Sequence, residues 1–291
     1  MSCSAITIRQ ALEQMTKTDT FFIISNYNTD PEQYLHYCED YHIYDQSPDI
    51  EIREKLENKY TKISFVENTG HNISDYFRFF IDNYESLPQH MMLAKGNMIG
   101  RHVTQEYFDR VYKNKYFTHL YDDRTWVDKR DIAYQLYDGA FLETNNSWYA
   151  SAKTHKYFRT YNELLTFIFK NSIIPKWLLF SPGACYIVSR DQVLRYPKEF
   201  YENLKYLVSY TYFPSEAYHI ERMLHVIFSA NYEINSYMKD ILAFQEEIKK
   251  HERLKLFAEL KSTTVNRIWK RLFCSVSARY NSFLYRMMLG K

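Results

Sequence analysis

Hydrophobic and polar residues along the first hundred positions form a pattern that predicts strands separated by helices. Apolar runs rich in strand-forming residues cover 20–25, 41–44, 62–66 and 90–94, and apolar residues at helical spacing fill 73–84. Most of these runs end in polar residues, as expected where a buried strand leaves a sheet. Strands that alternate with helices predict an α/β fold, a three-layer α/β/α sandwich with a mostly parallel central sheet.

The second part of the chain has a less regular pattern. Residues 104–170 are expected to be helical and loop-like, followed by two strand pieces at 177–180 and 184–188 with a bend between them. Further elements are predicted in the order helix 197–210, helix 215–229 and strand 232–235.

The C-terminal residues differ from the rest in both pattern and charge. Long helical segments are predicted over 238–260 and 264–289, and apolar and aromatic residues recur in the second at three- and four-residue steps. The final 32 residues carry seven Lys and Arg and no acid, whereas the remaining 259 residues have a net charge of −5. We therefore expect one globular domain at 1–239 and a basic amphipathic helical tail at 240–291.

Such a tail fits two kinds of partner. A basic amphipathic helix can lie in the headgroup region of an anionic bilayer. The same stripe can pack on the domain or on a second copy of the chain as an oligomer contact, and periodicity does not separate these alternatives. Nucleic acid is not expected as a partner, because a nucleic-acid-binding domain has its basic residues on the folded body, which is acidic here.

Cysteine usage and hydropathy indicate the compartment. Cys3, Cys38, Cys185 and Cys274 are far apart and form no Cys-x-x-Cys pair, and the chain starts with no signal-peptide pattern. No window of about 18 consecutive apolar residues is present. The sequence therefore predicts free thiols, no structural zinc and a cytoplasmic location, with any membrane association peripheral at the cytoplasmic face of the inner membrane.

One segment combines polar side chains with a glycine between a predicted strand and a predicted helix. Asn68, Gly70 and His71 lie where the amides of the next helix point outward, a geometry that binds phosphates or sugars. Neither the P-loop pattern nor Gly-x-Gly-x-x-Gly is present. A simple turn in which Gly70 relaxes the backbone explains the segment equally well.

Several segments together resemble glycosyltransferases of the GT-A type. The likeness rests on the polar turn at 26–31, on the 67–72 turn with its helix, and on Met91-Met92-Leu93-Ala94-Lys95-Gly96-Asn97. It continues through Phe180-Ser181-Pro182-Gly183-Ala184 and Pro214-Ser215-Glu216-Ala217. The greatest likeness is to poorly characterised families encoded in polysaccharide gene clusters.

The resemblance implies a GT-A-like fold and a nucleotide-sugar donor. Donor contacts are expected from Asn26, Asn68, Gly70, His71, Lys95, Gly96, Asn97 and Arg222. Acceptor contacts are expected from Trp177, Phe180 and Gly183. Aromatic rings such as those of Trp177 and Phe180 can stack on a sugar, but core packing explains both rings at least as well.

The chain departs from the GT-A pattern at the metal site. Most GT-A enzymes carry Asp-x-Asp after the strand that precedes the active site, and this pair holds a divalent metal against the donor diphosphate. Lys95-Gly96-Asn97 stands at that place here, and a lysine can meet the diphosphate charge directly. The pair Asp122-Asp123 is the nearby alternative and fits a solvated loop as well. Metal dependence therefore stays open, and no metal ligand is assigned.

Glu216 is the candidate general base, because it occupies the slot where the resembling enzymes carry an acidic catalytic residue. The alternative is a carboxylate at a helix N-terminus, favoured by the helix dipole. Glu221 lies roughly 140° further round the same helix, so the two acids do not share a face. Arg222 belongs to a polar stripe that either contacts the leaving diphosphate or faces solvent.

These features lead to one main functional hypothesis and one alternative. The main hypothesis is a glycosyltransferase that moves a sugar from a nucleotide-sugar donor to a growing cell-surface polysaccharide or lipid-linked glycan. The alternative is a non-catalytic sugar-binding or scaffold protein of the same pathway, which the missing Asp-x-Asp permits.

Overall fold

The computed structural model describes residues 17–122, 133–135, 139–150 and 153–288, and these divide into two compact units. The first unit covers 1–244 and the second 245–291. This division is close to the boundary expected at 239/240.

A six-stranded sheet forms the centre of the first unit, in the order β3-β2-β1-β4-β9-β5. Its strands are β1 (Phe21–Asn26), β2 (Tyr41–Asp45), β3 (Ile63–Phe65), β4 (His90–Lys95), β5 (Thr118–His119) and β9 (Tyr186–Ser189). The first four strands in this order run parallel, whereas β9 is antiparallel to both β4 and β5. The predicted α/β class with a mostly parallel central sheet is therefore confirmed.

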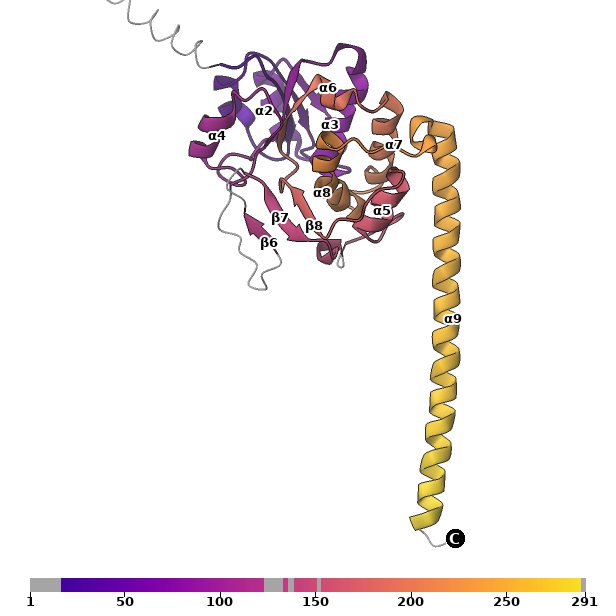
Figure 1. Ribbon diagram of the computed structural model, residues 1–291. Helices are drawn as coiled ribbons and strands as arrows, with labels where there is room; N and C mark the ends of the chain where they lie inside the picture. Colours follow the sequence, from indigo (N-terminus) through magenta and orange to yellow (C-terminus); the bar gives the residue numbers. More distant parts are fainter. Residues whose placement is uncertain (1–16, 123–132, 136–138, 151–152, 289–291) are drawn as a thin grey trace, which may run out of the picture. The chain divides into compact units, whose positions relative to one another are not determined.

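Helices cover both faces of this sheet (Figure 1). The helices of the first unit are α2 (Ile50–Lys59), α3 (His71–Asp82), α4 (Gln105–Val111), α5 (Tyr161–Ile168), α6 (Arg190–Val193), α7 (Lys198–Val208) and α8 (Ser215–Ser229), with short 3₁₀ turns η1 (Pro31–His36), η2 (Tyr84–Ser86), η3 (Trp148–Ala150) and η4 (Ser236–Lys239). Phe22 of β1 belongs to a buried cluster with Leu56 of α2 and Phe108 of α4. On the opposite face, the rings of Phe21 and Phe79 of α3 are 5.0 Å apart. This alternation follows from the two-residue period of a strand.

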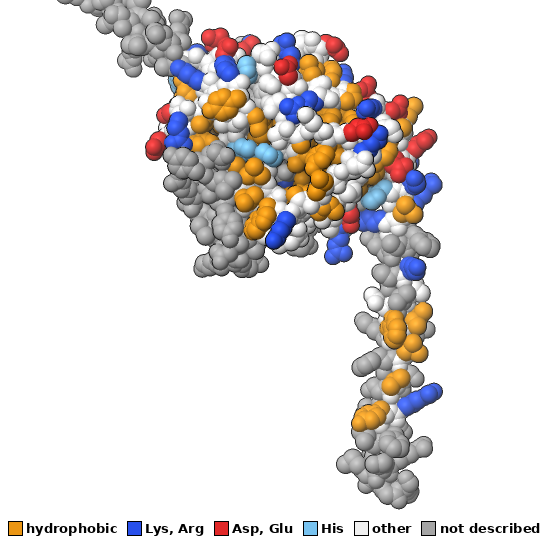
Figure 2. Space-filling view, viewed as in Figure 1, with side chains coloured by type: hydrophobic (Ala, Val, Ile, Leu, Met, Phe, Trp, Pro, Cys, Tyr) orange, Lys and Arg blue, Asp and Glu red, His pale blue; other side chains and the backbone are white. Residues whose placement is uncertain are grey.

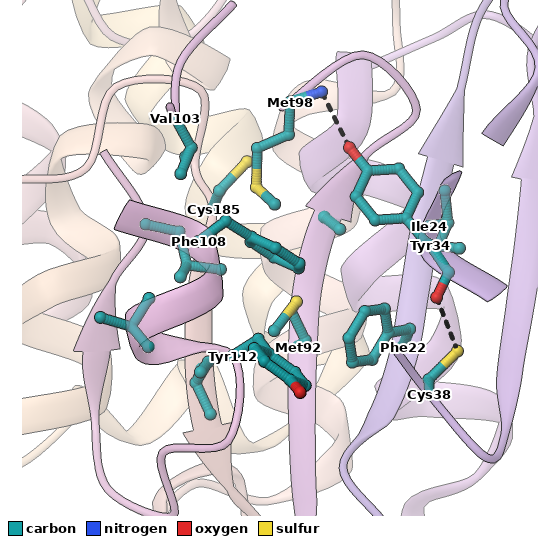
Figure 3. Packing of buried hydrophobic residues seen from close by; sticks show 14 of the residues in the cluster. Phe22, Ile24, Tyr34, Cys38, Met92, Met98, Val103, Phe108, Tyr112 and Cys185 are labelled. Atoms are coloured by element: carbon teal, nitrogen blue, oxygen red, sulfur yellow. Dashed lines mark hydrogen bonds between the residues drawn. The ribbon is translucent and has the colours of Figure 1, made fainter. Parts of the chain in front are cut away.

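Tyr34 connects the core to the loop after β4. Its ring is fully buried in the cluster shown in Figure 3. Its hydroxyl donates to the carbonyl of Lys95 at 2.7 Å and accepts from the amide of Met98 at 3.0 Å. The core therefore fixes the backbone on which Lys95, Gly96 and Asn97 stand.

A second, three-stranded antiparallel sheet was not expected from the sequence. It consists of β6 (Ala133–Gln135), β7 (Phe141–Thr144) and β8 (Trp177–Phe180). The helical and loop-like expectation for 104–170 was thus wrong in part, and β8 and β9 belong to different sheets. The expected strand at 232–235 was also wrong, because its Ile234 makes only an isolated bridge to Phe169.

The described part of the second unit is helical. One helix, α9 (Ile241–Met288), runs without the break expected between 260 and 264. Exposed apolar side chains on it include Ile268, Trp269, Leu272, Val276 and Tyr280, and hydrophobic and basic side chains are visible along it in Figure 2. Among the described residues, none of the helices is long and apolar enough to cross a membrane. Whether the stripe contacts a bilayer or protein stays a prediction.

Candidate functional site

A small cavity lies at the carboxyl ends of β1, β2 and β4. It measures about 100 Å³ and is lined by Ser25, Tyr27, Gln46, His71, Asn72, Lys95, Gly96, Asn97, Arg101 and Tyr212. The strand order reverses at β1, because β2 and β3 lie on one side of it and β4 lies on the other. Such a switch point leaves a crevice outside the strand ends, where ligands bind in open α/β sheets. We call this space the Lys95 cavity.

Lys95 brings a positive charge to the cavity. Burial lowers the pKa of Lys95, and the nearby Arg101 guanidinium lowers it further. None of the ion pairs among the described residues includes Lys95. A half-buried cation that no ion pair holds is stabilised by an anionic ligand, because the ligand supplies a partner in direct contact.

Gly96 is required by close packing rather than by flexibility. A Cβ atom at this position would overlap the Asn26 side chain and lie 2.7 Å from Oγ1 of Thr29. The absence of a side chain lets the backbone after β4 pass against the turn after β1. Lys95, Gly96 and Asn97 therefore line the cavity together, and their contact with a donor stays a prediction.

His71 lines the same cavity in its neutral form. Its ring stacks on Phe213, with centroids 4.2 Å apart and an interplanar angle of 9°. Burial lowers the pKa of His71 to about 3, and Lys95 contributes in the same direction. At neutral pH the imidazole is thus available as a hydrogen-bonding group rather than as a charge.

Two amides at the start of α3 are used within the fold, and phosphate binding at this turn stays a prediction. The amide of Gly70 donates to the carbonyl of Thr211 at 2.9 Å, and that of His71 donates to Tyr212 at 3.0 Å. Gly70 has a φ of 68°, and a Cβ there would lie 2.8 Å from Val208 Cγ2. Gly70 therefore serves the turn and its packing, and does not line the cavity.

Two asparagines expected at the donor also lie outside the cavity lining. Asn26 is fully buried, and its amide nitrogen donates to the carbonyl of Thr29 and to Asp45, both at 2.8 Å. These bonds, together with the hydroxyl of Thr29 donating to Asn26 Oδ1, shape the turn after β1. Asn68 lies in the loop before α3 and is not among the residues that line the cavity.

Asp75 lies behind the cavity and was missed in the sequence. Its Oδ2 accepts from Ser25 Oγ at 2.6 Å and from Gln46 Nε2 at 2.8 Å, and both of these residues line the cavity. Burial raises the pKa of Asp75 to about 7, against these two hydrogen bonds. Ser25 and Gln46 could have been found from the sequence, because each stands at or just after the end of a predicted strand.

Glu216, the predicted general base, does not line the Lys95 cavity and is surrounded by hydrogen-bond donors of the protein. Its Oε1 accepts the backbone amides of Lys156, Tyr157 and Phe158 at 3.0, 2.6 and 2.9 Å. Its Oε2 accepts from the hydroxyl of Tyr210 at 2.7 Å, and the side chain is fully buried. A carboxylate that is saturated by protein donors holds these segments together, so this geometry argues against the role predicted for Glu216.

Arg222, predicted to contact the donor, is instead paired inside the protein. Its Nε donates to Glu143, and its Nη1 donates to Glu221 at 3.0 Å. The guanidinium carbon lies 3.4 Å from the ring centroid of Tyr149 and 4.6 Å from that of Phe180. Its charge and its faces are thus used within the fold.

The residues predicted for the acceptor do not form one surface. Phe180 is buried with Tyr121 and Phe141, and Trp177 is partly exposed at the start of β8. Core packing therefore accounts for Phe180, the alternative considered from the sequence.

Gly183 joins the cavity to Glu221. Its φ is 85°, its amide donates to Glu221 Oε1 at 2.7 Å, and its carbonyl accepts from Asn72 Nδ2 at 2.7 Å. Asn72 lines the Lys95 cavity, so Glu221 is connected to it through Gly183. Burial raises the pKa of Glu221, against the opposing effects of Arg222, the Gly183 amide and Lys95.

No group of three or more metal-ligating side chains is present among the described residues. Asp122 accepts from both the amide and the hydroxyl of Thr104, the residue that caps α4. Its neighbour Asp123 lies outside the described residues. Metal dependence therefore stays open.

Comparisons with known proteins give a family and nothing narrower. Neither the curated proteins nor the solved structures contain a significant match to the sequence. Residues 23–241 match the family described as "Protein of unknown function (DUF3431)". This match covers the central sheet, the Lys95 cavity and most of the chain, so the protein belongs to that family.

Proposed function

We propose that this protein is a glycosyltransferase that takes a sugar from a nucleotide-sugar donor and transfers it to a glycan or lipid-linked glycan acceptor. The supporting observation is the Lys95 cavity, in which an unpaired cation lies at the switch point of a mostly parallel sheet. The strand order with an antiparallel β9 beside β4 is compatible with a GT-A-like domain.

Lys95 is the group proposed to meet the donor diphosphate. When the bond between the sugar and the diphosphate breaks, negative charge grows on the leaving phosphate. A cation placed there beforehand stabilises this charge without reorganisation. Arg101 also lines the cavity and can add a second positive charge. In this proposal the two side chains take over the role of a divalent metal.

Glu221 replaces Glu216 as the proposed general base. A base must be reachable from the reacting hydroxyl and must accept its proton, which a raised pKa favours. Glu221 keeps a side-chain exposure of 12%, its pKa is raised, and its carboxylate interacts electrostatically with Lys95. Glu216 is fully buried and engaged by four donors.

Nucleotide binding by the purified full chain tests the proposal. We expect one of a panel of nucleoside diphosphates to bind, and the variant Lys95→Gln to weaken its affinity about tenfold or more, because a charge-assisted contact is worth about 1.5–3 kcal/mol. Binding of the parent nucleoside should change little. The exposed Lys55→Gln on α2 is the matched control. Equal losses for diphosphate and nucleoside would remove Lys95 from the phosphate site.

A catalytically silent sugar-binding protein is the second candidate. The observation that favours it is the structural engagement of Glu216, which removes the acid expected at the catalytic slot. Release of free nucleotide from a bound donor, with and without acceptor glycans, separates the two candidates. Release that disappears in Glu221→Gln supports the enzyme, and donor binding without any release supports the silent protein.

A further inference from the structure

A second cavity lies between α3, α7 and the segment that Glu216 holds. It measures about 540 Å³, and its lining includes Arg78 of α3, Lys205 and Tyr206 of α7, Lys156, and Tyr210. This size is within the range of cavities that hold small ligands. It shares no lining residue with the Lys95 cavity. We call it the Arg78 cavity.

Two cations in the Arg78 cavity have no counter-charge in contact. Neither Arg78 nor Lys205 takes part in an ion pair among the described residues. Nε of Arg78 is buried and has no hydrogen-bond partner in the described part of the chain. Burial lowers the pKa of Lys205, and repulsion by Arg78 lowers it further. An anion between them would remove the repulsion and satisfy the buried donor.

Two carboxylates also line the cavity and limit its charge. Asp82 and Glu202 offset part of the positive charge that Arg78, Lys156 and Lys205 bring, so the lining has a formal charge of +1. Neither carboxylate forms an ion pair with Arg78 or Lys205 in the described chain. A ligand with one or a few negative charges therefore fits better than a polyanion.

An aromatic wall stands beside the cations. Tyr206 is 44% exposed and lies with its ring centroid 6.0 Å from that of Tyr157. Tyr157 and Tyr210 meet edge to face at 5.7 Å. Glu216 fixes this wall, because it accepts the amide of Tyr157 and the hydroxyl of Tyr210. The site thus offers a preorganised ring surface next to positive charge.

We propose that the Arg78 cavity binds an acidic saccharide, that is, a sugar whose carboxylate or phosphate meets Arg78 and Lys205 while its ring packs on Tyr206. Aromatic rings supply apolar contact area, and the two cations supply charge-assisted hydrogen bonds. Tyr210 lines this cavity and Tyr212 lines the Lys95 cavity, so a short segment connects the two sites. The inference concerns binding and is independent of the proposed transfer reaction.

Calorimetric titration of the full chain tests this inference with three probes. They are a hyaluronan tetrasaccharide, which carries carboxylates, the neutral tetramer of N-acetylglucosamine, and inorganic pyrophosphate. We expect the acidic saccharide to bind more tightly than the other two. Lys205→Gln should weaken its binding about tenfold or more, because it removes a charge-assisted contact. Lys55→Gln, the same change on the exposed face of α2, should leave it unaltered.

Two further variants keep the inference falsifiable. Arg78→Gln should reproduce the loss, with thermal unfolding of each variant as the check on folding. Tyr206→Ala should weaken the acidic saccharide but not pyrophosphate. No binding of the acidic saccharide, equal binding of the neutral tetramer, or an unchanged affinity in a folded Lys205→Gln would overturn the inference.

The outcome is separable from that of the proposed transferase. If no nucleoside diphosphate binds while the acidic saccharide binds and is lost in Lys205→Gln, the transferase proposal is wrong and the saccharide site stands. If Lys95→Gln weakens diphosphate binding and Lys205→Gln has no effect on the saccharide, the reverse holds.

Discussion

Arg222 and Lys95 show two ways in which this domain holds a cation away from water. Burial by itself lowers the pKa of Arg222, but Glu143 and Tyr149 more than offset it, so that its pKa is raised. Arg222 donates to Glu143 and Glu221, and its guanidinium lies on the ring of Tyr149. The charge is satisfied by the fold, so the group stabilises the link between α8 and β7 and is left with little capacity for a ligand.

Around Lys95, by contrast, the titratable groups are not held in ion pairs within the described part of the chain. Burial lowers the pKa of Lys95, raises that of Asp75 to about 7 and lowers that of His71 to about 3. Each group is thus moved toward its neutral form, because the fold supplies too little opposite charge. The comparison teaches that burial alone does not mark a functional charge. A charge whose partner is missing from the fold does mark a functional site, because a ligand can then supply the partner.

The largest expected effect on stability comes from breaking the ion pair between Arg222 and Glu143. Glu143→Ala leaves Arg222 buried with one of its two carboxylates gone, and we expect a loss of about 3–5 kcal/mol in the free energy of unfolding. Denaturant unfolding measures it. Lys95→Gln is the corresponding change in the Lys95 cavity. It should lower the free energy of unfolding by less than about 1 kcal/mol, since no ion pair is broken. Similar losses for the two variants would contradict the comparison.

Glu216 gives the next largest effect. Glu216→Ala removes the acceptor for three backbone amides and for Tyr210. Buried donors without partners cost about 1–3 kcal/mol each, and relaxation toward water recovers part of this, so we expect a loss of about 3 kcal/mol. Unfolding curves of wild type and variant measure it. A variant of unchanged stability that has lost only transfer would restore the general-base role predicted from the sequence.

The sequence predicted the central strands well because their signal is local. β1 and β4 are buried on both faces and appear as uninterrupted apolar runs. Their polar ends located Lys95, Gly96 and Asn97 correctly at the sheet edge, because parallel strands end at the same edge. The short strands β6 and β7 were missed, because runs of three and four residues carry too little periodicity.

The assignment of single side chains needed information that a sequence does not carry. Helical phase correctly separated Glu216 from Glu221, but it could not say which distant segments would donate to each carboxylate. Asn26 and Gly70 were expected at the donor because they flank the correct strands. Their polar groups are used by Asp45 and Thr211, which are distant in sequence. Such saturation becomes visible only when the partners are in place.

The smallest expected effect is a pH dependence of stability that comes from Asp75, which lies behind the Lys95 cavity. Asp75 has a pKa of about 7 when folded, against an ordinary value of 3.8, because it is buried. Between these values only the folded chain holds the proton, so this stabilising contribution is present below about pH 4 and is lost as the pH rises through 7. Asp75→Asn cannot titrate, so the stability of wild type relative to this variant should fall by about 2 kcal/mol from pH 5 to pH 8. Unfolding of both proteins at the two pH values measures this difference, and the other titrating groups cancel in the comparison. The exposed Asp191→Asn is the control. A difference that stays constant with pH would show that Asp75 is ionised when folded, and that the Lys95 region is compensated after all.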